Sequence, residues 1–384
     1  MTISVEKNAV RLALSLAAPQ VTSDFAGTPL VLVDVADLPL STIATGTDIL
    51  YTVLSIESWD LIALQALNAG NNSTSDSYLA VKNLFDQIAL SGAKVSKVLI
   101  GVNRSTTWLA TFNAVWALTQ DFILCIGGVD DGGTSGTITD LLATAKRVEA
   151  VGRVYCGTTR DAASLTADSG SATLGSKAKA DSVNSFLQIS DNDAAFEVSC
   201  ILGKILPDFI PSLNPCYKAL KEAEGLNVTD AEFAFAQAKR LNIILNDGED
   251  PVLIPFNGVA SAGGHYGGIC SNGEFLDREI AKAYMNIEIP RRFYNNYMKR
   301  EQKIDFNTIG SQEVTAKLIE IITQIGITEP PRPFIEPDFT VFVPDMSSAD
   351  YSSAKKSQRH LDGVTGDGEI TGAVNVVNIA LNFI

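Results

Sequence analysis

The chain has 384 residues, of which 46% are hydrophobic, and a formal net charge of −15 at pH 7. This length allows two domains, each with its own core. The acidic excess argues against nucleic acid or an anionic membrane as the main partner, because those surfaces bind basic proteins. No apolar run approaches the roughly 20 residues that span a bilayer, and the first residues lack the pattern of a signal peptide. We therefore expect a soluble protein without membrane insertion that folds in a cytoplasm.

Both ends of the chain alternate between apolar and other residues. The pattern runs through residues 10–16 and again through 377–383, where no charged residue or proline interrupts it. A period of two is typical of a strand with one buried face. Exposed edge strands usually carry lysine, proline or bulges, because their unpaired backbone groups recruit other chains. The pattern predicts two arm strands, whose apolar residues are Val10, Leu12, Leu14, Leu16, Val377, Ile379, Leu381 and Phe383.

Between residues 30 and 156 short apolar runs alternate with segments of helical periodicity. This order is typical of an α/β domain with a largely parallel sheet. Ser105 is the expected N-cap of one helix, whose Trp108, Phe112 and Trp116 are expected in the core. The predicted strands are 30–33, 49–54, 97–102, 122–126 and 153–156, and the predicted helices are 76–90, 105–118 and 137–151.

The middle of the chain has weaker signals. Residues 161–182 have little periodicity, which indicates a surface loop or a short helix. Helices are expected over 194–206 and over 231–241, the second after the capping pair Thr229 and Asp230. The turn-forming residues 246–251 separate two apolar runs, 243–245 and 252–256, and predict a pair of strands.

The last third is expected to be rich in helix. A long helix should begin at Glu274 and kink or break at Pro290, which lacks a backbone N–H. A second amphipathic helix, 312–325, is expected to stop at Gly326. The prolines of 330–333 indicate a stiff linker, and 339–343 has the apolar character of a strand.

The five cysteines are scattered and odd in number, with no CxxC pair, so we expect buried free thiols rather than a disulfide or metal site. They are Cys125, Cys156, Cys200, Cys216 and Cys270.

A search for catalytic motifs finds none. HExxH, GxSxG, Walker A and GxGxxG patterns are absent from the sequence. The two histidines, His265 and His360, have no companion ligands nearby, so His265 is expected to be a loop imidazole bonded to backbone. The glycine-rich run 127–133 follows a predicted strand, but it lacks lysine and contains Asp130 and Asp131, which would repel a phosphate. We interpret it as a plain turn between strand and helix, and we expect no cofactor.

Late in the sequence the pattern resembles a known family. The stretches "GGHYGGICSNGEFLDREIAKAYMNIEIPRRF", "FTVFVPDMSSAD" and "ITGAVNVVNIALNFI", together with "ILYTVLSI" and "VEAVGRVYCGTTRDA", are similar to contractile tail sheath proteins of myophages and to the sheaths of related injection systems. The resemblance implies a protomer of mixed α/β and α+β class. Its expected parts are an N-terminal β-arm (1–20), an α/β outer domain (21–258), a helix-rich inner domain (259–372) and a C-terminal β-arm (373–384).

The resemblance also implies partners. Sheath subunits form hexameric rings that stack helically, and their arms insert beside the inner domains of neighbours by strand addition. The expected partners are other copies of this chain, a tail tube protein, and baseplate and tail terminator proteins. The implied role is structural rather than enzymatic, in a virion tail assembled in the host bacterial cytoplasm. An α/β enzyme with an unfamiliar site and a fixed-shape capsid or tail-tube component are the alternatives.

A basic region late in the chain has two interpretations. It could be an ordinary solvated face of helices and loops. Given the resemblance, it could instead face an acidic tube surface. Its residues are Arg291, Arg292, Lys299, Arg300 and Lys303.

Overall fold

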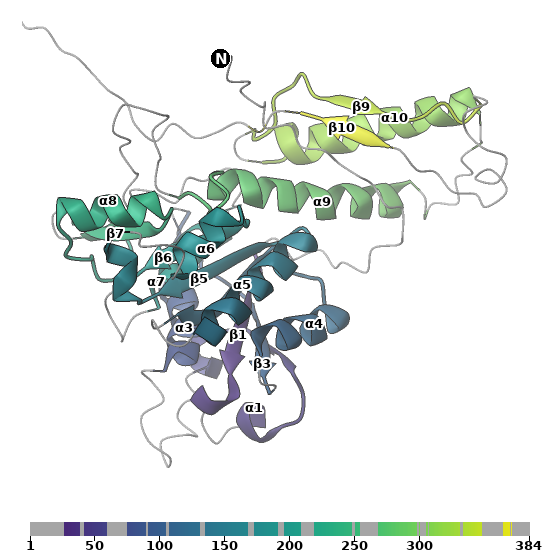
Figure 1. Ribbon diagram of the computed structural model, residues 1–384. Helices are drawn as coiled ribbons and strands as arrows, with labels where there is room; N and C mark the ends of the chain where they lie inside the picture. Colours follow the sequence, from purple (N-terminus) through teal and green to yellow (C-terminus); the bar gives the residue numbers. More distant parts are fainter. Residues whose placement is uncertain are drawn as a thin grey trace, which may run out of the picture. The chain divides into compact units, whose positions relative to one another are not determined.

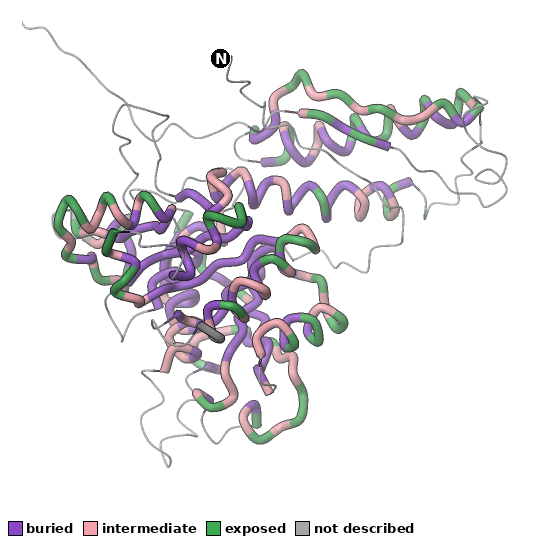
Figure 2. Tube along the Cα trace, viewed as in Figure 1, coloured by how far each residue is buried: buried purple, intermediate pink, exposed green. Residues whose placement is uncertain are grey.

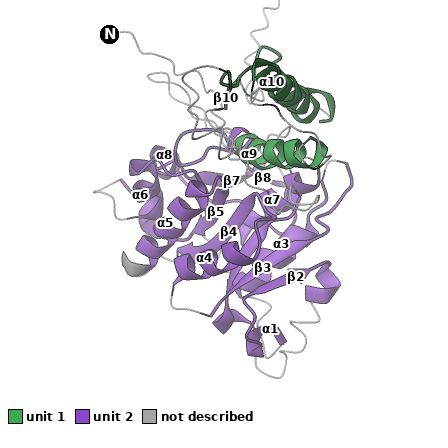
Figure 3. Ribbon diagram, turned by 90° about the vertical axis from the view of Figure 1, so that its right-hand side faces the viewer, with its two compact units in different colours: residues 1–23, 281–372 green, residues 24–280, 373–384 purple. Residues whose placement is uncertain are grey.

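A computed structural model describes most of the chain between residues 27 and 370. The described residues are 27–38, 42–59, 75–89, 91–104, 107–130, 135–167, 173–190, 196–208, 219–247, 250–253, 268–297, 299, 305, 307–330, 333–347, 364–368 and 370. They fall into two compact units, one within 24–280 and one within 281–372 (Figure 3). The predicted arms and the predicted boundary between residues 258 and 259 lie outside the described residues.

The first unit is built on a sheet of eight described strands in the order β2-β3-β1-β4-β5-β6-β7-β8 (Figure 1). The six inner strands run parallel, and β2 and β8 each pair antiparallel at an edge. The predicted α/β class with a largely parallel sheet is therefore confirmed. The strands are β1 (Leu30–Asp34), β2 (Leu50–Val53), β3 (Val98–Asn103), β4 (Leu124–Asp130), β5 (Val154–Thr159), β6 (Ser185–Ile189), β7 (Asn242–Asp247) and β8 (Asp250–Leu253).

Helices cover both faces of this sheet. One face carries α3 (Asp76–Asp86) and α7 (Glu197–Ile205), and the other carries α4 (Trp108–Leu118), α5 (Ser135–Ala150), α6 (Leu174–Ala180) and α8 (Asp230–Ala238) (Figure 3). Because both faces are covered, β1, β3 and β5 are buried throughout most of their length (Figure 2). The shorter helical segments are η1 (Val35–Asp37), α1 (Thr42–Thr45), η3 (Ala162–Leu165) and η4 (Leu206–Asp208).

One capping expectation for this unit was wrong. The N-cap of α4 is Thr107, whose hydroxyl accepts the Ala110 N–H at 3.2 Å, and not Ser105. The carboxylate of Asp140 in α5 accepts the next two free N–H groups, those of Trp108 and Leu109, so capping comes partly from another helix. Residues 161–182, expected to be a surface loop or a short helix, contain the short helices η3 and α6, and α6 is largely buried rather than at the surface.

Other local signals are confirmed. Thr229 caps α8 in a capping box with Glu232. The strands β7 and β8 form the expected antiparallel pair. Phe112 is buried, and Trp108 and Trp116 pack partly buried against the same core.

The second unit holds most of α9 (Leu276–Asn296), which begins in the first unit, together with α10 (Thr308–Thr323) and a two-stranded ribbon of β9 (Thr340–Phe342) and β10 (Thr365–Asp367). Of the expected kink or break at Pro290, the break does not occur, because α9 continues through the proline. The carbonyl that loses its donor belongs to Asn286, which is exposed and can bind water instead. No described helix is both long and apolar enough to cross a membrane.

Candidate assembly surfaces

The ribbon in the second unit presents an exposed strand. Phe342 pairs with Thr365, Val341 with Gly366 and Thr340 with Asp367. The side chain of Phe342 is 62% exposed, whereas Val341 is half-buried. Among the described strands β9 has one neighbour, β10, so its other edge carries a row of backbone groups that a further strand could pair with.

The segment that follows β9 is attached to the start of α10. The buried Ser311 hydroxyl donates to the Pro344 carbonyl at 3.0 Å and accepts the Met346 N–H at 2.9 Å. Nearby, the Thr308 hydroxyl lies 2.9 Å from that of Ser347. These bonds fix where the chain leaves the ribbon.

The segment that precedes β9 is attached to the other end of α10. This helix does not stop at Gly326 as expected, because the π-turn η7 (Gln324–Thr328) extends it. Gly326 is required by a close approach instead, since an added Cβ would overlap the side chain of Ile335. The Phe334 N–H donates to the Gly326 carbonyl at 2.9 Å. The ribbon is thus held at both ends of β9 by one helix.

Two of the five basic residues singled out in the sequence belong to a charge network inside the second unit. Glu288, only 2% exposed, accepts from Arg291 Nε and from Arg292 Nε, each at 2.6 Å. Arg292 also forms a two-pronged pair with Glu329, at 2.7 and 2.6 Å. Two carboxylates therefore face two guanidinium groups, and the network is close to neutral.

This pairing shifts the pKa of the groups in it. The hydrogen bonds from Arg292 lower the pKa of Glu329 below its ordinary value. Burial would lower the pKa of Arg292, but the hydrogen bonds to Glu329 and Glu288 outweigh burial and raise it. Both groups stay charged at neutral pH, so the ion pair persists there.

The structure brings Arg291 and Arg292 together and places Lys299 at an exposed position. The other two members of the basic region, Arg300 and Lys303, lie outside the described residues. All eight predicted arm residues, from Val10 to Leu16 and from Val377 to Phe383, also lie outside them. The assignment of both groups to contacts with other subunits stays a prediction.

The carboxyl edge of the parallel sheet is where α/β proteins usually bind ligands. Here it carries Asp34, Asp37 and Asp76. The Ser77 hydroxyl donates to Asp37 at 2.8 Å, and Arg160 forms a two-pronged pair with Asp76. Burial raises the pKa of Asp37, the Ser77 hydroxyl opposes this, and the two neighbouring aspartates add to it. Within the described residues no group of three or more His, Cys, Asp or Glu side chains is placed to hold a metal ion.

The described part of the glycine-rich run 127–133 belongs to a strand and not to the expected turn. Gly127 and Gly128 lie inside β4, which continues to Asp130, and residues 131–134 lie outside the described residues. A Cβ on Gly128 would lie 2.8 Å from the Trp108 ring, and one on Gly127 would overlap the Tyr155 ring. These glycines make room for two aromatic rings, which is a packing requirement rather than a phosphate site.

The free thiols are confirmed for four of the five cysteines. Cys125, Cys156, Cys200 and Cys270 are buried and form no disulfide, and Cys216 lies outside the described residues. Burial raises the pKa of the Cys125, Cys156 and Cys200 thiols, so they stay protonated and unreactive at neutral pH.

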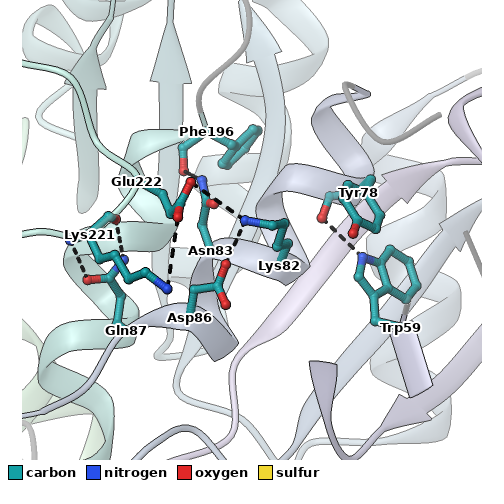
Figure 4. Close-up of polar contacts among 9 residues, drawn as sticks. All are labelled: Trp59, Tyr78, Lys82, Asn83, Asp86, Gln87, Phe196, Lys221 and Glu222. Atoms are coloured by element: carbon teal, nitrogen blue, oxygen red, sulfur yellow. Dashed lines mark hydrogen bonds and ion pairs between the residues drawn. The ribbon is translucent and has the colours of Figure 1, made fainter. Parts of the chain in front are cut away.

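Sequence patterns did not reveal a polar clamp around α3 (Figure 4). Gln87, fully buried, accepts the Lys221 N–H at 3.0 Å and donates to the Lys221 carbonyl at 2.5 Å. One turn earlier, Asn83 donates to the Phe196 carbonyl at 3.2 Å. These amides tie loops more than 100 positions away to one helix. In the sequence, the one sign of this role is that Asn83 and Gln87 are four residues apart, which places two amides on one otherwise apolar face of the helix.

Two solved structures share this fold. The first is described as the cryo-EM structure of the anti-feeding prophage baseplate, 6-fold symmetrised; it is 11% identical, with 97% of this chain and 96% of that chain covered and a TM-score of 0.62. The second is the cryo-EM structure of the anti-feeding prophage helical sheath in contracted state, 10% identical, with 96% and 94% covered and a TM-score of 0.58. No protein-family model matches the chain, and no curated protein matches it in sequence.

These matches define the class of protein by its fold. One of these neighbours is described as a helical sheath in contracted state, so the resemblance to contractile sheaths that the sequence suggested is confirmed at the level of the fold. At 10–11% identity the likeness establishes a shared fold along nearly the whole chain.

Proposed function

We propose that this chain is a structural subunit of a contractile tail or injection apparatus and that it polymerises into a sheath around a tube protein. The observation that carries this proposal is the coverage of 96% of this chain and 94% of a chain from a contracted helical sheath. A match of both units argues for the same kind of subunit rather than for a shared α/β domain alone. The proposed role is mechanical rather than enzymatic.

The proposed assembly uses the two arms. Residues 10–16 and 377–383 of one copy add as strands to neighbouring copies, and the exposed edge of β9 beside Phe342 is a candidate acceptor. Each backbone hydrogen bond contributes on the order of 1 kcal/mol, and each cross-strand pair roughly 0.2–1 kcal/mol. One arm alone is therefore reversible. Two arms per subunit in hexameric, helically stacked rings hold strongly through effective concentration.

The other proposed partners follow from the same role. A tube protein with an acidic surface would face Lys299, Arg300 and Lys303, since Arg291 and Arg292 are already paired with Glu288 and Glu329. Baseplate and terminator proteins would bound the sheath at its two ends. The proposed location is a virion tail, or a phage-derived particle, assembled in a bacterial cytoplasm.

A second candidate is a sheath-like subunit of the baseplate itself. It is favoured by the match to a baseplate structure, at a TM-score of 0.62. A baseplate subunit would occur in a fixed, small number of copies and would form rings without growing into tubes.

Negative-stain electron microscopy of the purified full chain over a concentration series tests these proposals. We expect hollow tubes with a helical surface, because a sheath without its tube should settle into the contracted lattice. Isolated rings at every concentration would favour the baseplate subunit. Small discrete particles that show a ligand-dependent rise in melting temperature would favour an enzyme and contradict both proposals.

A further inference from the structure

Two carboxylates approach one asparagine at the amino end of β6. Asn184 directly precedes this strand, Glu149 lies in the last turn of α5, and Glu279 lies in the first turn of α9, all within the first unit. The Asn184 side chain donates from Nδ2 to Glu279 Oε2 at 2.6 Å, and its backbone N–H is hydrogen-bonded to Glu149. Three segments that are distant in the sequence therefore bring three oxygen-bearing side chains together.

The amide oxygen of Asn184 has no hydrogen-bond donor. Asn184 is only 9% exposed, its Oδ1 is buried, and no described group hydrogen-bonds to this atom. Exchanging Oδ1 and Nδ2 does not help, because Oδ1 would then face the Glu279 carboxylate at 2.6 Å. Both atoms are bonded to one carbon, so Oδ1 lies beside the carboxylate that Nδ2 contacts. Since buried polar atoms nearly always have a partner, this oxygen requires a proton donor or a cation.

The turn before β6 holds this oxygen in place. Ser182 has a φ of 51°, in the left-handed region that non-glycine residues rarely adopt, and its N–H donates to the Lys179 carbonyl at 3.0 Å. On the other side of Asn184, the Ser185 carbonyl accepts the Ser271 N–H at 2.7 Å. A costly backbone conformation persists only where the surroundings enforce it, so the position of Asn184 is fixed before any ligand binds.

The charges around Asn184 favour a cation. Glu149 lies at the negative end of the α5 dipole, which disfavours a carboxylate and favours positive charge. Partial burial of its carboxyl group raises the pKa of Glu149; the Asn184 N–H opposes this rise, Glu279 adds to it, and Lys146 opposes it. Lys146 is itself paired with Asp181 at 2.8 Å. The nearby lysine is thus shared with another carboxylate.

We propose that Glu149, Glu279 and the Oδ1 of Asn184 bind a calcium ion. Ca²⁺ takes about six to eight oxygen ligands at roughly 2.3–2.6 Å and accepts irregular mixtures of carboxylate, amide and water oxygens, whereas Mg²⁺ demands a near-ideal octahedron. Zn²⁺ prefers nitrogen and sulfur ligands. Three protein ligands leave the remaining positions to water, so the dissociation constant should be about 10⁻⁴–10⁻³ M.

The existing hydrogen bonds are compatible with this site. Glu279 accepts the side-chain amides of Asn184 and Asn272, the second at 3.3 Å. A carboxylate has about four lone-pair sites, so it can accept these bonds and still bind an ion. The site is independent of the proposed sheath function, because it lies within one unit of a single chain and does not require polymerisation.

Equilibrium dialysis of the full chain against ⁴⁵Ca²⁺ tests the site directly, below the concentration at which polymers form. We expect one ion of this affinity per chain, and Glu149→Gln should weaken its binding about tenfold or more. The control is Glu320→Gln, which removes the same charge from an exposed glutamate that pairs with Lys317, and it should bind as wild type does. Equal binding by all three proteins would assign the ion to other carboxylates of this acidic chain and would overturn the proposal.

Thermal denaturation with Asn184→Asp gives a second test. This variant loses the Nδ2 bond and places a third carboxylate at the site, so its melting temperature should fall in EDTA. Calcium at about 10 mM should raise the melting temperature of wild type by about 2–5 °C, and that of Asn184→Asp by more, because the added carboxylate strengthens a cation site. Sodium chloride at the same ionic strength should do neither.

The remaining outcomes also decide the question. If Asn184→Asp fails to fold, Glu149→Gln, at an exposed position, replaces it, and its melting temperature should not respond to calcium. A wild-type chain that ignores calcium but becomes more stable as the pH falls from about 7 to about 5 would show that a proton on Glu149 satisfies Asn184. That result would overturn the proposal.

Discussion

Arg292 of α9 and Glu329, which follows the π-turn, form a two-pronged ion pair with nitrogen–oxygen distances of 2.7 and 2.6 Å. The pair joins two helical segments 37 positions apart in the chain. It also joins them next to Pro290, where α9 lacks one backbone hydrogen bond. This cross-link therefore attaches α9 to the residue after the π-turn, two positions beyond the proline.

The Arg292–Glu329 pair should make stability depend on pH in the acid range. Its hydrogen bonds lower the pKa of Glu329 in the folded state, so the unfolded state binds a proton first as the pH falls. The stabilisation is complete above the ordinary glutamate pKa, about 4.3, and is lost as the pH falls through the folded-state value. Glu329→Gln should lower the free energy of unfolding by about 0.5–1 kcal/mol at pH 7, a small effect because the carboxylate is half exposed. At a pH below the folded-state pKa of Glu329 the substitution should not change stability.

Urea denaturation of both proteins at pH 7 and at pH 3.5 measures this difference. Glu320→Gln is the matched control, since Glu320 pairs with Lys317 within one exposed helix turn and should change stability by less. A gap between Glu329→Gln and wild type that is the same at both pH values would show that the ion pair does not cause it.

Gly127 and Tyr155 should be strongly coupled. An added Cβ on Gly127 would overlap the Tyr155 ring, so Gly127→Ala should destabilise the first unit by about 1–3 kcal/mol. The cost should fall by at least half in a Tyr155→Leu background. The control is Gly27→Ala, where the nearest atom would be 3.8 Å away. Thermal denaturation of wild type, the two single variants and the double variant gives the coupling free energy between the two positions. Additive effects of the two substitutions would contradict the packing explanation.

The Tyr155 hydroxyl offers a separate prediction. It is buried, and no described group hydrogen-bonds to it. Tyr155→Phe removes a polar group that burial has already cut off from water, so stability should stay the same or rise by up to about 1 kcal/mol. Chemical denaturation measures the change. A loss of more than 1 kcal/mol would mean that the hydroxyl is hydrogen-bonded after all.

Gln87 should be one of the most sensitive polar positions. Its amide bonds both the N–H and the carbonyl of Lys221, and the side chain is fully buried (Figure 4). Gln87→Leu leaves the two backbone groups without their partner at a cost of about 2–3 kcal/mol. Gln120→Leu, at an exposed glutamine, serves as the control. Equal urea midpoints for the two variants would show that water replaces the lost bonds.

The C-terminal arm should be needed for polymerisation and not for folding. Ile379→Asp with Leu381→Asp places charges on the apolar face of the predicted strand and should abolish tubes in electron micrographs while the melting temperature stays unchanged. The control variant, Asn378→Asp with Asn382→Asp, adds the same charge to the opposite face of the strand, because successive residues of a strand point to opposite faces. This control should still form tubes. Tubes from both variants would exclude a one-sided arm strand.

The local chemistry of the sequence determined much of the fold. Runs such as 30–33 and 97–102 are strands because β-rich apolar stretches can be buried on both faces, and Thr229 with Glu232 starts α8 because the two side chains cap each other. The alternation of strand and helix signals along the sequence was sufficient to predict a largely parallel sheet. The scattered cysteines were sufficient to predict free, buried thiols.

The tertiary structure decided what depends on contacts between distant segments. The strand β6 was not predicted, because Ser185 and Gln188 interrupt its apolar pattern; the fold buries both and hydrogen-bonds them. Gly127, Gly128 and Gly326 read as turns or stops in the sequence, but Tyr155, Trp108 and Ile335 require them as close approaches. Arg292 was assigned to a basic region, but the fold places Glu329, 37 positions away, beside it and adds a second carboxylate to the local partner Glu288. A linear pattern encodes the propensity of each residue, whereas the partner that gives it a role is fixed only when the chain folds.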